Sequence, residues 1–226
     1  CTKLLYEYLG DLIVLDVGGA TTDLHSVTVE SDQVARLMIS PEPKAKRTVE
    51  GDLGVYVNRW KVVESIGEEK LREQCREQGF SMEHALETYR AIPKTEEEVK
   101  LVELLTREAV VKAAERHAGR LRYIYGPSGR STVAEGKDLT QVKYIVGTGG
   151  ALTRLPHREE IMREITRCNE SGMLLLPGEH AQILVDHDYI MASLGVLSKR
   201  YPQAAARLLE QSLGITFPER KAEEPV

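Results

Sequence analysis

The chain has 226 residues, of which 42% are hydrophobic, and a formal net charge of −5. This hydrophobic content supports a sizeable core and argues against a disordered protein. Charges of both signs are interspersed without a basic cluster, and no apolar stretch reaches the roughly 18 residues of a membrane span, so we expect neither a nucleic-acid partner nor a membrane partner.

The cysteines indicate a reducing environment. Cys1, Cys75 and Cys168 lie far apart and are odd in number, which fits neither a disulfide framework nor a zinc site. We therefore expect a cytoplasmic protein. Because an apolar strand pattern follows Cys1 almost at once, we also expect further sequence upstream of it.

The first part of the chain predicts a β-meander. Leu12–Val17 is a short apolar run typical of a fully buried strand. Residues 24–29 are rich in β-branched side chains, and residues 34–39 read as a third strand. Pro41 and Pro43 would end the meander.

The next part predicts helices. Residues 52–60 and 64–78 favour helix, and Thr95 with Glu98 has the pattern of a capping box. Apolar residues then recur at helical spacing up to a stop at Gly119.

The last part mixes strands and helices. Residues 121–125 and 142–146 predict strands, whereas residues 158–167, 188–200 and 203–213 predict helices. The chain as a whole therefore reads as an α/β protein with a helical insert.

The sequence DVGGATTD at residues 16–23 carries the most chemical information. Its glycines let the backbone approach a ligand, and successive amides in a tight turn can hold anionic oxygens. Asp16, at the end of a buried strand, has the position and chemistry to hold Mg²⁺ through water. The turn leads into a strand, unlike the Walker A loop and the dinucleotide fingerprint, which open a helix. The alternative is a plain glycine hairpin. The predicted phosphate-binding residues are Gly18, Gly19, Thr21 and Thr22.

A second glycine turn, GTGG at residues 147–150, follows another predicted strand. Glycines there would let a sugar and a base lie against the backbone. Alone, this pattern is as often a simple strand–helix turn, so its value lies in its pairing with residues 16–23. The predicted nucleoside-binding residues are Gly147, Thr148, Gly149 and Gly150.

Several acids near these turns leave alternatives open. Asp23, Glu50 and Asp52 are candidates for the same cleft, although Glu50 and Asp52 fit equally well as acids at a helix N-terminus. Asp186 and Asp188 belong to a loose polar cluster, for which helix capping is preferred over metal binding.

The two glycine turns resemble the phosphate-2 and adenosine motifs of the actin/Hsp70/sugar-kinase ATPase superfamily. Residues 50–54 fall where that superfamily enters its second-domain helices, and residues 186–195 resemble its closing helix. The resemblance implies an actin-like ATPase (ribonuclease H-like) second domain, with a mixed sheet that starts with an antiparallel meander and with a helical insert. It also implies ATP or ADP and Mg²⁺ as ligands and Asp16 as the catalytic residue.

The resemblance implies a division of the chain into four parts. Residues 1–50 would be the phosphate-2 meander, and residues 51–120 the helical insert. Residues 121–218 would complete the nucleotide-binding domain with its adenosine motif, and residues 219–226 would form a tail.

A narrower resemblance is to the MutL/GlmL group, the accessory proteins of cobalamin-dependent glutamate (methylaspartate) mutase. It rests on DVGGATTDLHSV at residues 16–27, TVEGDLGVYVN at residues 48–58 and GKDLTQVKYIVGTGGALTRL at residues 136–155. The match covers nearly the whole chain, and the group shares only a name with the mismatch-repair protein. It implies a chaperone-like reactivating factor whose partner is a cobalamin-dependent mutase subunit.

One departure from the superfamily concerns its phosphate-1 motif, which these 226 residues lack. The motif is expected in an N-terminal domain of the same protein, which would complete the ATP cleft. We therefore expect the intact protein to be an ATPase and this chain to be inactive alone. The alternatives are an ATP-dependent small-molecule kinase or hydantoinase-type hydrolase, and a non-catalytic actin-fold scaffold.

Overall fold

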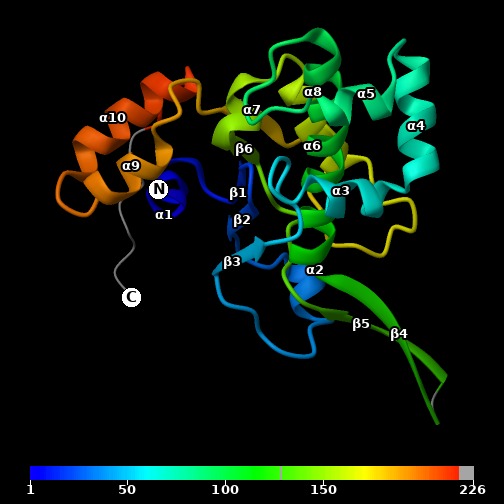
Figure 1. The fold of residues 1–226 in the computed structure, drawn as a ribbon. Helices are drawn as coiled ribbons and strands as arrows, with labels where there is room; N and C mark the ends of the chain where they lie inside the picture. The colour runs from blue at the N-terminus through cyan, green and yellow to red at the C-terminus, as the bar shows by residue number, and fades with distance from the viewer. Residues whose placement is uncertain (128, 219–226) are drawn as a thin grey trace.

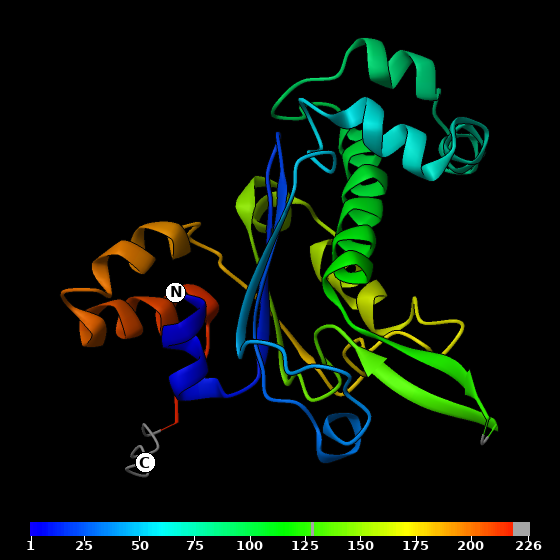
Figure 2. The same cartoon turned by 90° about the horizontal axis from the view of Figure 1, so that it is seen from below.

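The computed structural model describes residues 1–127 and 129–218 and is built around a five-stranded mixed sheet (Figures 1 and 2). The strand order is β3-β2-β1-β6-β7; β1, β2 and β3 are antiparallel, whereas β6 and β7 run parallel to β1. The predicted α/β class and the antiparallel meander are confirmed. The strands are β1 Leu12–Val17, β2 Thr22–Val27, β3 Ala45–Glu50, β6 Tyr144–Thr148 and β7 Gln182–Val185.

The third strand of the meander is not the one predicted. Residues 34–39 begin within the short helix α2 (Asp32–Ala35), whose N-terminus is capped because the Ser31 hydroxyl accepts the Val34 N–H at 3.3 Å. The strand is instead β3, and the predicted end at Pro41 and Pro43 precedes it. Its sequence AKRTVE gives little strand signal because it forms a partly exposed edge, where charged residues are common.

The helical region between β3 and β4 begins later than predicted. Residues 51–58 form a turn and loop, so the predicted helix over residues 52–60 is wrong for most of its length. The predicted helix over residues 64–78 is broken at Gly67, whose φ of 89° few other residues adopt. The helices are α3 Arg59–Ile66, α4 Glu68–Glu77, α5 Met82–Glu87 and α6 Glu96–His117.

The capping box at the start of α6 is confirmed. The Thr95 hydroxyl accepts the Glu98 N–H at 3.2 Å, and the Glu98 carboxylate accepts the Thr95 N–H at 3.1 Å. This cap fixes the long helix that crosses one face of the sheet (Figure 2).

Helices cover both faces of the sheet. Ile13, Leu15 and Val17 of β1 pack in the core shared with α6, whereas Leu12 and Val14 pack in a second core. The α6 side also holds α7 (Gly149–Arg154), α8 (Arg158–Arg163) and the 3₁₀ turn η1 (Glu164–Thr166). The other side holds α1 (Thr2–Leu9), α9 (Met191–Leu197) and α10 (Pro202–Leu213).

The helix predictions for the last part are largely confirmed. The helix predicted over residues 158–167 is α8 followed by η1, and that over residues 203–213 is α10. The helix predicted over residues 188–200 is shorter, because only α9 is helical there. Neither α1 nor β7 was predicted.

A separate two-stranded hairpin, β4 (Arg120–Gly126) with β5 (Gly129–Glu135), extends away from the sheet in both views (Figures 1 and 2). The strand predicted over residues 121–125 is confirmed as β4. Among the described residues, no helix is both long and apolar enough to cross a membrane. The predicted tail at residues 219–226 lies outside the described residues.

Candidate functional site

The first glycine turn joins β1 to β2 and is fastened by the loop that follows β3. The Gly18 N–H donates to the Thr21 carbonyl at 2.9 Å, which closes the turn. The N–H groups of Tyr56 and Val57 both donate to the Gly19 carbonyl, at 2.9 and 2.7 Å. A loop that is distant in sequence, but adjacent in space, therefore fixes the conformation of this turn.

Gly54 and Asn58, which both belong to the stretch TVEGDLGVYVN at residues 48–58, are part of this attachment, although neither was predicted as a site residue. A Cβ on Gly54 would lie 2.2 Å from the Ala20 carbonyl carbon, so only glycine lets the two backbones meet. The Asn58 side-chain amide donates to the carbonyls of Ala20 and Gly51 at 2.8 and 2.7 Å. The stretch TVEGDLGVYVN thus contains residues that hold the turn.

The turn leaves donors free at the sheet edge. Gly19 and Ala20 are exposed, and within the described residues their backbone N–H groups form no hydrogen bond. By contrast, the Thr22 hydroxyl is buried and donates to the Leu53 carbonyl at 2.8 Å. The backbone of Gly19 and Ala20 can therefore receive an anion, whereas the Thr22 side chain holds the turn in place.

Asp16 is the penultimate residue of β1 and lies between two other strands. It lies opposite Asp23 on β2 and opposite Thr148 on β6. Burial raises the pKa of the Asp16 carboxyl, and the neighbouring carboxylates of Asp23 and Asp186 raise it further. Asp23 is itself paired with Arg47 at 2.7 Å. Asp16 is therefore a carboxylate whose charge lacks a direct cationic partner in the described part of the chain.

A cation would relieve this arrangement, but the side chains do not form a direct metal cage. No group of three or more His, Cys, Asp or Glu residues within the described ranges is arranged to hold a metal ion. The metal role of Asp16 stays a prediction.

The second glycine turn lies beside the first. Gly149 has a φ of 85°, and a Cβ there would lie 2.5 Å from Oδ1 of Asp16 and from the Val17 carbonyl oxygen. At Gly147 a Cβ would lie 2.5 Å from Sδ of Met162, in the core. These two glycines therefore let the strands and helix pack closely.

Thr148 and Gly150 have surroundings that differ from those of Gly147 and Gly149. The Thr148 hydroxyl is buried and donates to the Asp186 carboxylate at 2.8 Å. Asp186 also accepts the N–H groups of Ile190 and Met191 at the start of α9, although the N-cap residue of this helix is Ile190 and not Asp186 or Asp188. A Cβ on Gly150 would meet nothing within 4 Å. Of the four predicted nucleoside-binding residues, only Gly150 faces open space.

Both glycine turns line one pocket of about 230 Å³. Gly18 and Gly19 form one part of its wall, and Gly150 forms another. The sequence motifs, 131 positions apart, thus meet as predicted. The remaining lining residues are Val55, Tyr56, Tyr89, Arg90, Ala91, Ile92, Pro93, Val99, Val102, Ala151, Arg154, Leu155 and Pro156.

An aromatic wall gives this pocket its shape. The rings of Tyr56 and Tyr89 stack with their centroids 6.0 Å apart, and the Arg59 guanidinium lies 5.7 and 5.4 Å from them. The Tyr89 hydroxyl donates to the Val55 carbonyl. Arg90 and Arg154 add positive charge to the lining. The sequence did not single out these residues.

Asp16 and the pocket lie on different faces of the sheet. Side chains alternate along a strand, so Asp16 shares the face of Leu12 and Val14, which carries α1, α9 and α10. Tyr89 and Leu155 of the pocket belong to the core on the α6 face. The turn at residues 18–21 joins β1 to β2 at the edge of the sheet, between the face that carries Asp16 and the face that carries the pocket.

Glu50 and Asp52 do not line the pocket. Both accept hydrogen bonds from the Arg116 guanidinium at 2.7 Å, near the end of α6. The helix N-terminal alternative is wrong, because α3 begins only at Arg59; the place of these acids in a nucleotide cleft stays a prediction. These acids join β3 and the following turn to α6.

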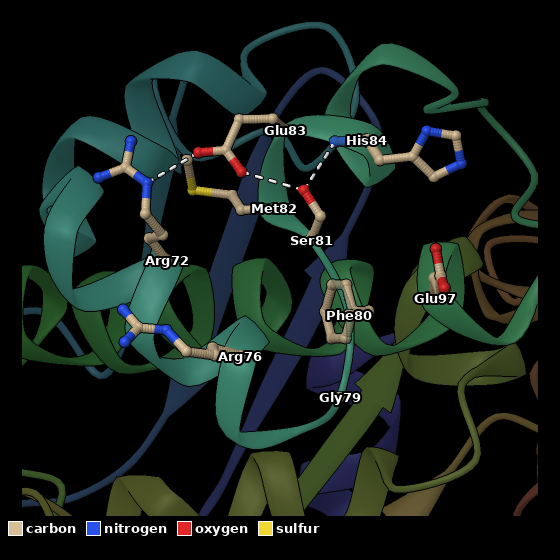
Figure 3. Close-up of a pocket in the computed structure, with 9 residues that line it drawn as sticks. All are labelled: Arg72, Arg76, Gly79, Phe80, Ser81, Met82, Glu83, His84 and Glu97. Carbon is tan, nitrogen blue, oxygen red and sulfur yellow. Dashed lines mark hydrogen bonds and ion pairs between the residues drawn. The ribbon is translucent and has the colours of Figure 1, made fainter.

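A larger hollow of about 520 Å³ lies between α4, α5 and the start of α6 (Figure 3), and no residue of either glycine turn lines it. Its polar groups mainly hold one another: Arg72 is paired with Glu83 at 2.7 Å, and the Ser81 hydroxyl accepts the His84 N–H. Because these bonds join the middle of α4 to the first turn of α5 and cap α5, we do not take this hollow as the functional site.

The fold and the site define an α/β domain with two glycine turns at one sheet edge, and the comparisons with known proteins show its family. A sequence model described as "MutL protein" matches residues 1–213. "Protein MutL" from Clostridium tetanomorphum is 36% identical over 211 residues. This alignment covers 91% of the chain and 46% of the relative, so the chain spans about half of that protein. The chain belongs to the MutL protein family.

Proposed function

We propose that this chain supplies the nucleotide-binding half of an ATP-dependent accessory factor for a cobalamin-dependent mutase. The observation that carries the proposal is the meeting of Gly18 and Gly19 with Gly150 at one pocket. The GTGG turn is a weak signal alone, but its convergence in space with the DVGGATTD turn is much less easily explained by two separate strand turns. The actin-like ATPase fold inferred from the motifs is part of the same proposal.

The nucleoside is proposed to lie in the pocket beside Gly150. At about 230 Å³ the pocket is smaller than most sites for whole ligands, so it suits a base and not a complete nucleotide. Tyr56, Tyr89 and the apolar residues around them offer flat and aliphatic surface. Such a lining with few polar groups is typical of sites that bind a ring system.

The phosphates are proposed to cross the edge of the sheet. The free N–H groups of Gly19 and Ala20 lie at this edge and would donate to phosphate oxygens. Beyond the edge, the Asp16 carboxylate lies on the other face, near Asp23 and Asp186. A nucleotide placed in this way would extend from the pocket, over the turn, toward Asp16.

Mg²⁺ bound with the nucleotide would neutralise phosphate charge. Asp16 would accept hydrogen bonds from the water ligands of that ion and so orient them. Its position is fixed on both sides, by β2 and by β6. A carboxylate that the fold already holds in position reduces the rearrangement of active-site groups needed during hydrolysis. Asp16 is thus proposed as the catalytic residue of the intact protein.

The mutase connection is proposed from the family resemblance. In this proposal an N-terminal domain of the intact protein completes the cleft, and nucleotide binding biases a hinge between the two domains. The change in shape would open the mutase and release damaged cobalamin. Because the chain spans 46% of its relative, this activity is proposed for the whole protein.

The proposal is tested by reactivation with the intact protein. An inactivated cobalamin-dependent mutase is mixed with the protein, Mg-ATP and fresh cofactor, and the recovered turnover is followed. Recovery that requires ATP and is lost in Asp16→Asn supports the proposal. Full recovery with an Asp16→Asn protein that cannot hydrolyse ATP would instead identify a non-catalytic scaffold. Hydrolysis that responds to a small molecule but not to a mutase would favour a kinase or a hydantoinase-type hydrolase.

A further inference from the structure

The β4–β5 hairpin forms a feature separate from the nucleotide site. Its base is anchored, because the Leu121 N–H donates to the Met173 carbonyl at 2.7 Å and the Ala134 N–H donates to the Leu37 carbonyl at 2.7 Å. Leu121 and Ala134 also pack in a small core with Val34 and Leu175. The remainder of the hairpin extends beyond this anchor (Figure 2).

The extended part exposes large apolar side chains in sequence. Tyr123 is 47% exposed, Ile124 51% and Tyr125 79%. Scattered exposed apolar residues are ordinary, but three consecutive ones on a protruding element mark an interaction surface. A two-stranded hairpin is marginally stable in water by itself, so bare aromatic residues at its end gain little from the fold.

Both faces of the hairpin carry exposed side chains. Tyr123 and Tyr125 share the face that begins with partly buried Leu121, whereas Ile124 lies on the other face with Arg122. The Arg130 guanidinium lies 4.5 Å from the Tyr123 ring centroid, so tyrosine and arginine form a single surface. Tyrosine and arginine are, with tryptophan, the residue types enriched among the residues that contribute most binding energy at protein interfaces.

The charge of the hairpin indicates the chemistry of its partner. The hairpin region, residues 119–136, contains three arginines and one glutamate and is therefore positively charged. The whole chain, in contrast, has a net charge of −5. Of the arginines, Arg122 is paired with Glu135 at 2.7 Å. A positive arm on a negative protein favours a partner surface with carboxylates around an apolar hollow.

We propose that the β4–β5 hairpin is a docking arm that inserts into an acidic, apolar-lined surface of the partner protein. This inference rests on the proposed function, in which that partner is the mutase. The arm and the nucleotide site are joined through α6, which leads from beside the pocket at Val99 and Val102 directly to β4. The hairpin would therefore hold the mutase while the nucleotide site changes.

The experiment uses the intact protein and the purified mutase, with binding measured by calorimetry. The double variant Ile124→Ser/Tyr125→Ser removes the apolar end of the arm, and Val196→Ser on α9 is the control, since Val196 is 71% exposed. We expect the double variant to bind the mutase at least tenfold more weakly, and the control to bind as wild type. ATP binding should be the same in all three proteins. Equal mutase binding by all three would overturn the docking arm while leaving the proposed function standing.

Hydrogen exchange of residues 120–126 distinguishes the other occupants. We expect fast exchange in the free intact protein at every concentration and slow exchange only when the mutase is added. Slow exchange in the free protein at low concentration would show that the rest of the same chain covers the arm. Protection that grows with protein concentration would identify a second copy. Either result would overturn the proposal, and failure of the wild-type protein to bind the mutase would overturn both this inference and the proposed function.

Discussion

Gly149 and Asp16 lie so close together that a Cβ atom on Gly149 would be 2.5 Å from Oδ1 of Asp16. The second glycine turn thus shapes the surroundings of the acid in the first. Gly149 also has a φ of 85°, which side chains rarely permit. The glycine is needed for the architecture before any ligand is considered.

We predict that Gly149→Ala destabilises the protein by about 3 kcal/mol, because strain at positive φ adds to the clash with Asp16 and Val17. The free energy of unfolding in urea measures this. Gly150→Ala is the matched control, since its Cβ meets no atom within 4 Å. It should leave the stability unchanged or raise it by about 0.5–1 kcal/mol, as expected for alanine in a helix. Equal stabilities of the two variants would contradict the packing described for Gly149.

Asp16→Asn should separate stability from activity. Burial and the nearby carboxylates of Asp23 and Asp186 raise the pKa of Asp16 above its ordinary value of 3.8, so its ionised form disfavours folding. The folded state then binds more protons than the unfolded state, and stability falls as the pH rises through the raised pKa. The Asn variant should therefore have a higher melting temperature than wild type at pH 7.

The gain in melting temperature from Asp16→Asn should shrink below pH 3.8, where the wild-type carboxyl is protonated in both states. In the intact protein, the same variant should lose at least about 100-fold in ATP hydrolysis. If Asp16→Asn instead lowers the melting temperature at pH 7, and lowers it less at low pH, the charge of Asp16 is compensated in the folded protein.

His117, at the end of α6, should make stability depend on pH. Its ring is buried between the hydroxyls of Ser26 and Thr48, at 2.8 and 2.9 Å, and burial lowers its pKa to about 3. Between pH 6.5 and 3, His117 takes up a proton only in the unfolded state. The stabilising contribution of the neutral ring is therefore fully present above pH 6.5 and is lost as the pH decreases below it. This component should amount to about 2 kcal/mol between pH 7.5 and pH 5.

His117→Ala is the matching variant. It leaves two hydroxyls without their partner and should cost about 2–4 kcal/mol at pH 7.5. The difference in unfolding free energy between pH 7.5 and pH 5 should then decrease by about 2 kcal/mol. An unchanged pH dependence in the variant would mean that His117 is protonated in the fold.

The local motifs could be predicted from the sequence because short stretches determine them. The capping box at Thr95 is an interaction over three residues, and the apolar run of β1 is continuous. Helix α3 could not be placed, because residues 51–58 are held as a loop by hydrogen bonds to Gly18 and Gly19, which are distant in sequence.

The pocket shows the same limit more clearly. Gly18 and Gly150 were predicted from their motifs, but Tyr89 and Arg90 were not, because no local pattern marks residues that fold back from a helical region. Conversely, Gly147 and Thr148 belong to the motif yet face the interior, where packing against Met162 and a hydrogen bond to Asp186 explain them. The division of the chain into four parts stays a prediction.

The most direct test of the account is the binding of Mg-ATP to the intact Gly150→Leu protein, measured by calorimetry. A leucine at Gly150 would enter the pocket without meeting a neighbouring atom at Cβ, so the fold should be retained. Gly150→Ala serves as the small control. We predict that Gly150→Ala binds nearly as wild type and that Gly150→Leu, with an unchanged melting temperature, binds at least tenfold more weakly. Wild-type affinity in the folded Gly150→Leu protein would contradict the placement of the nucleotide in this pocket.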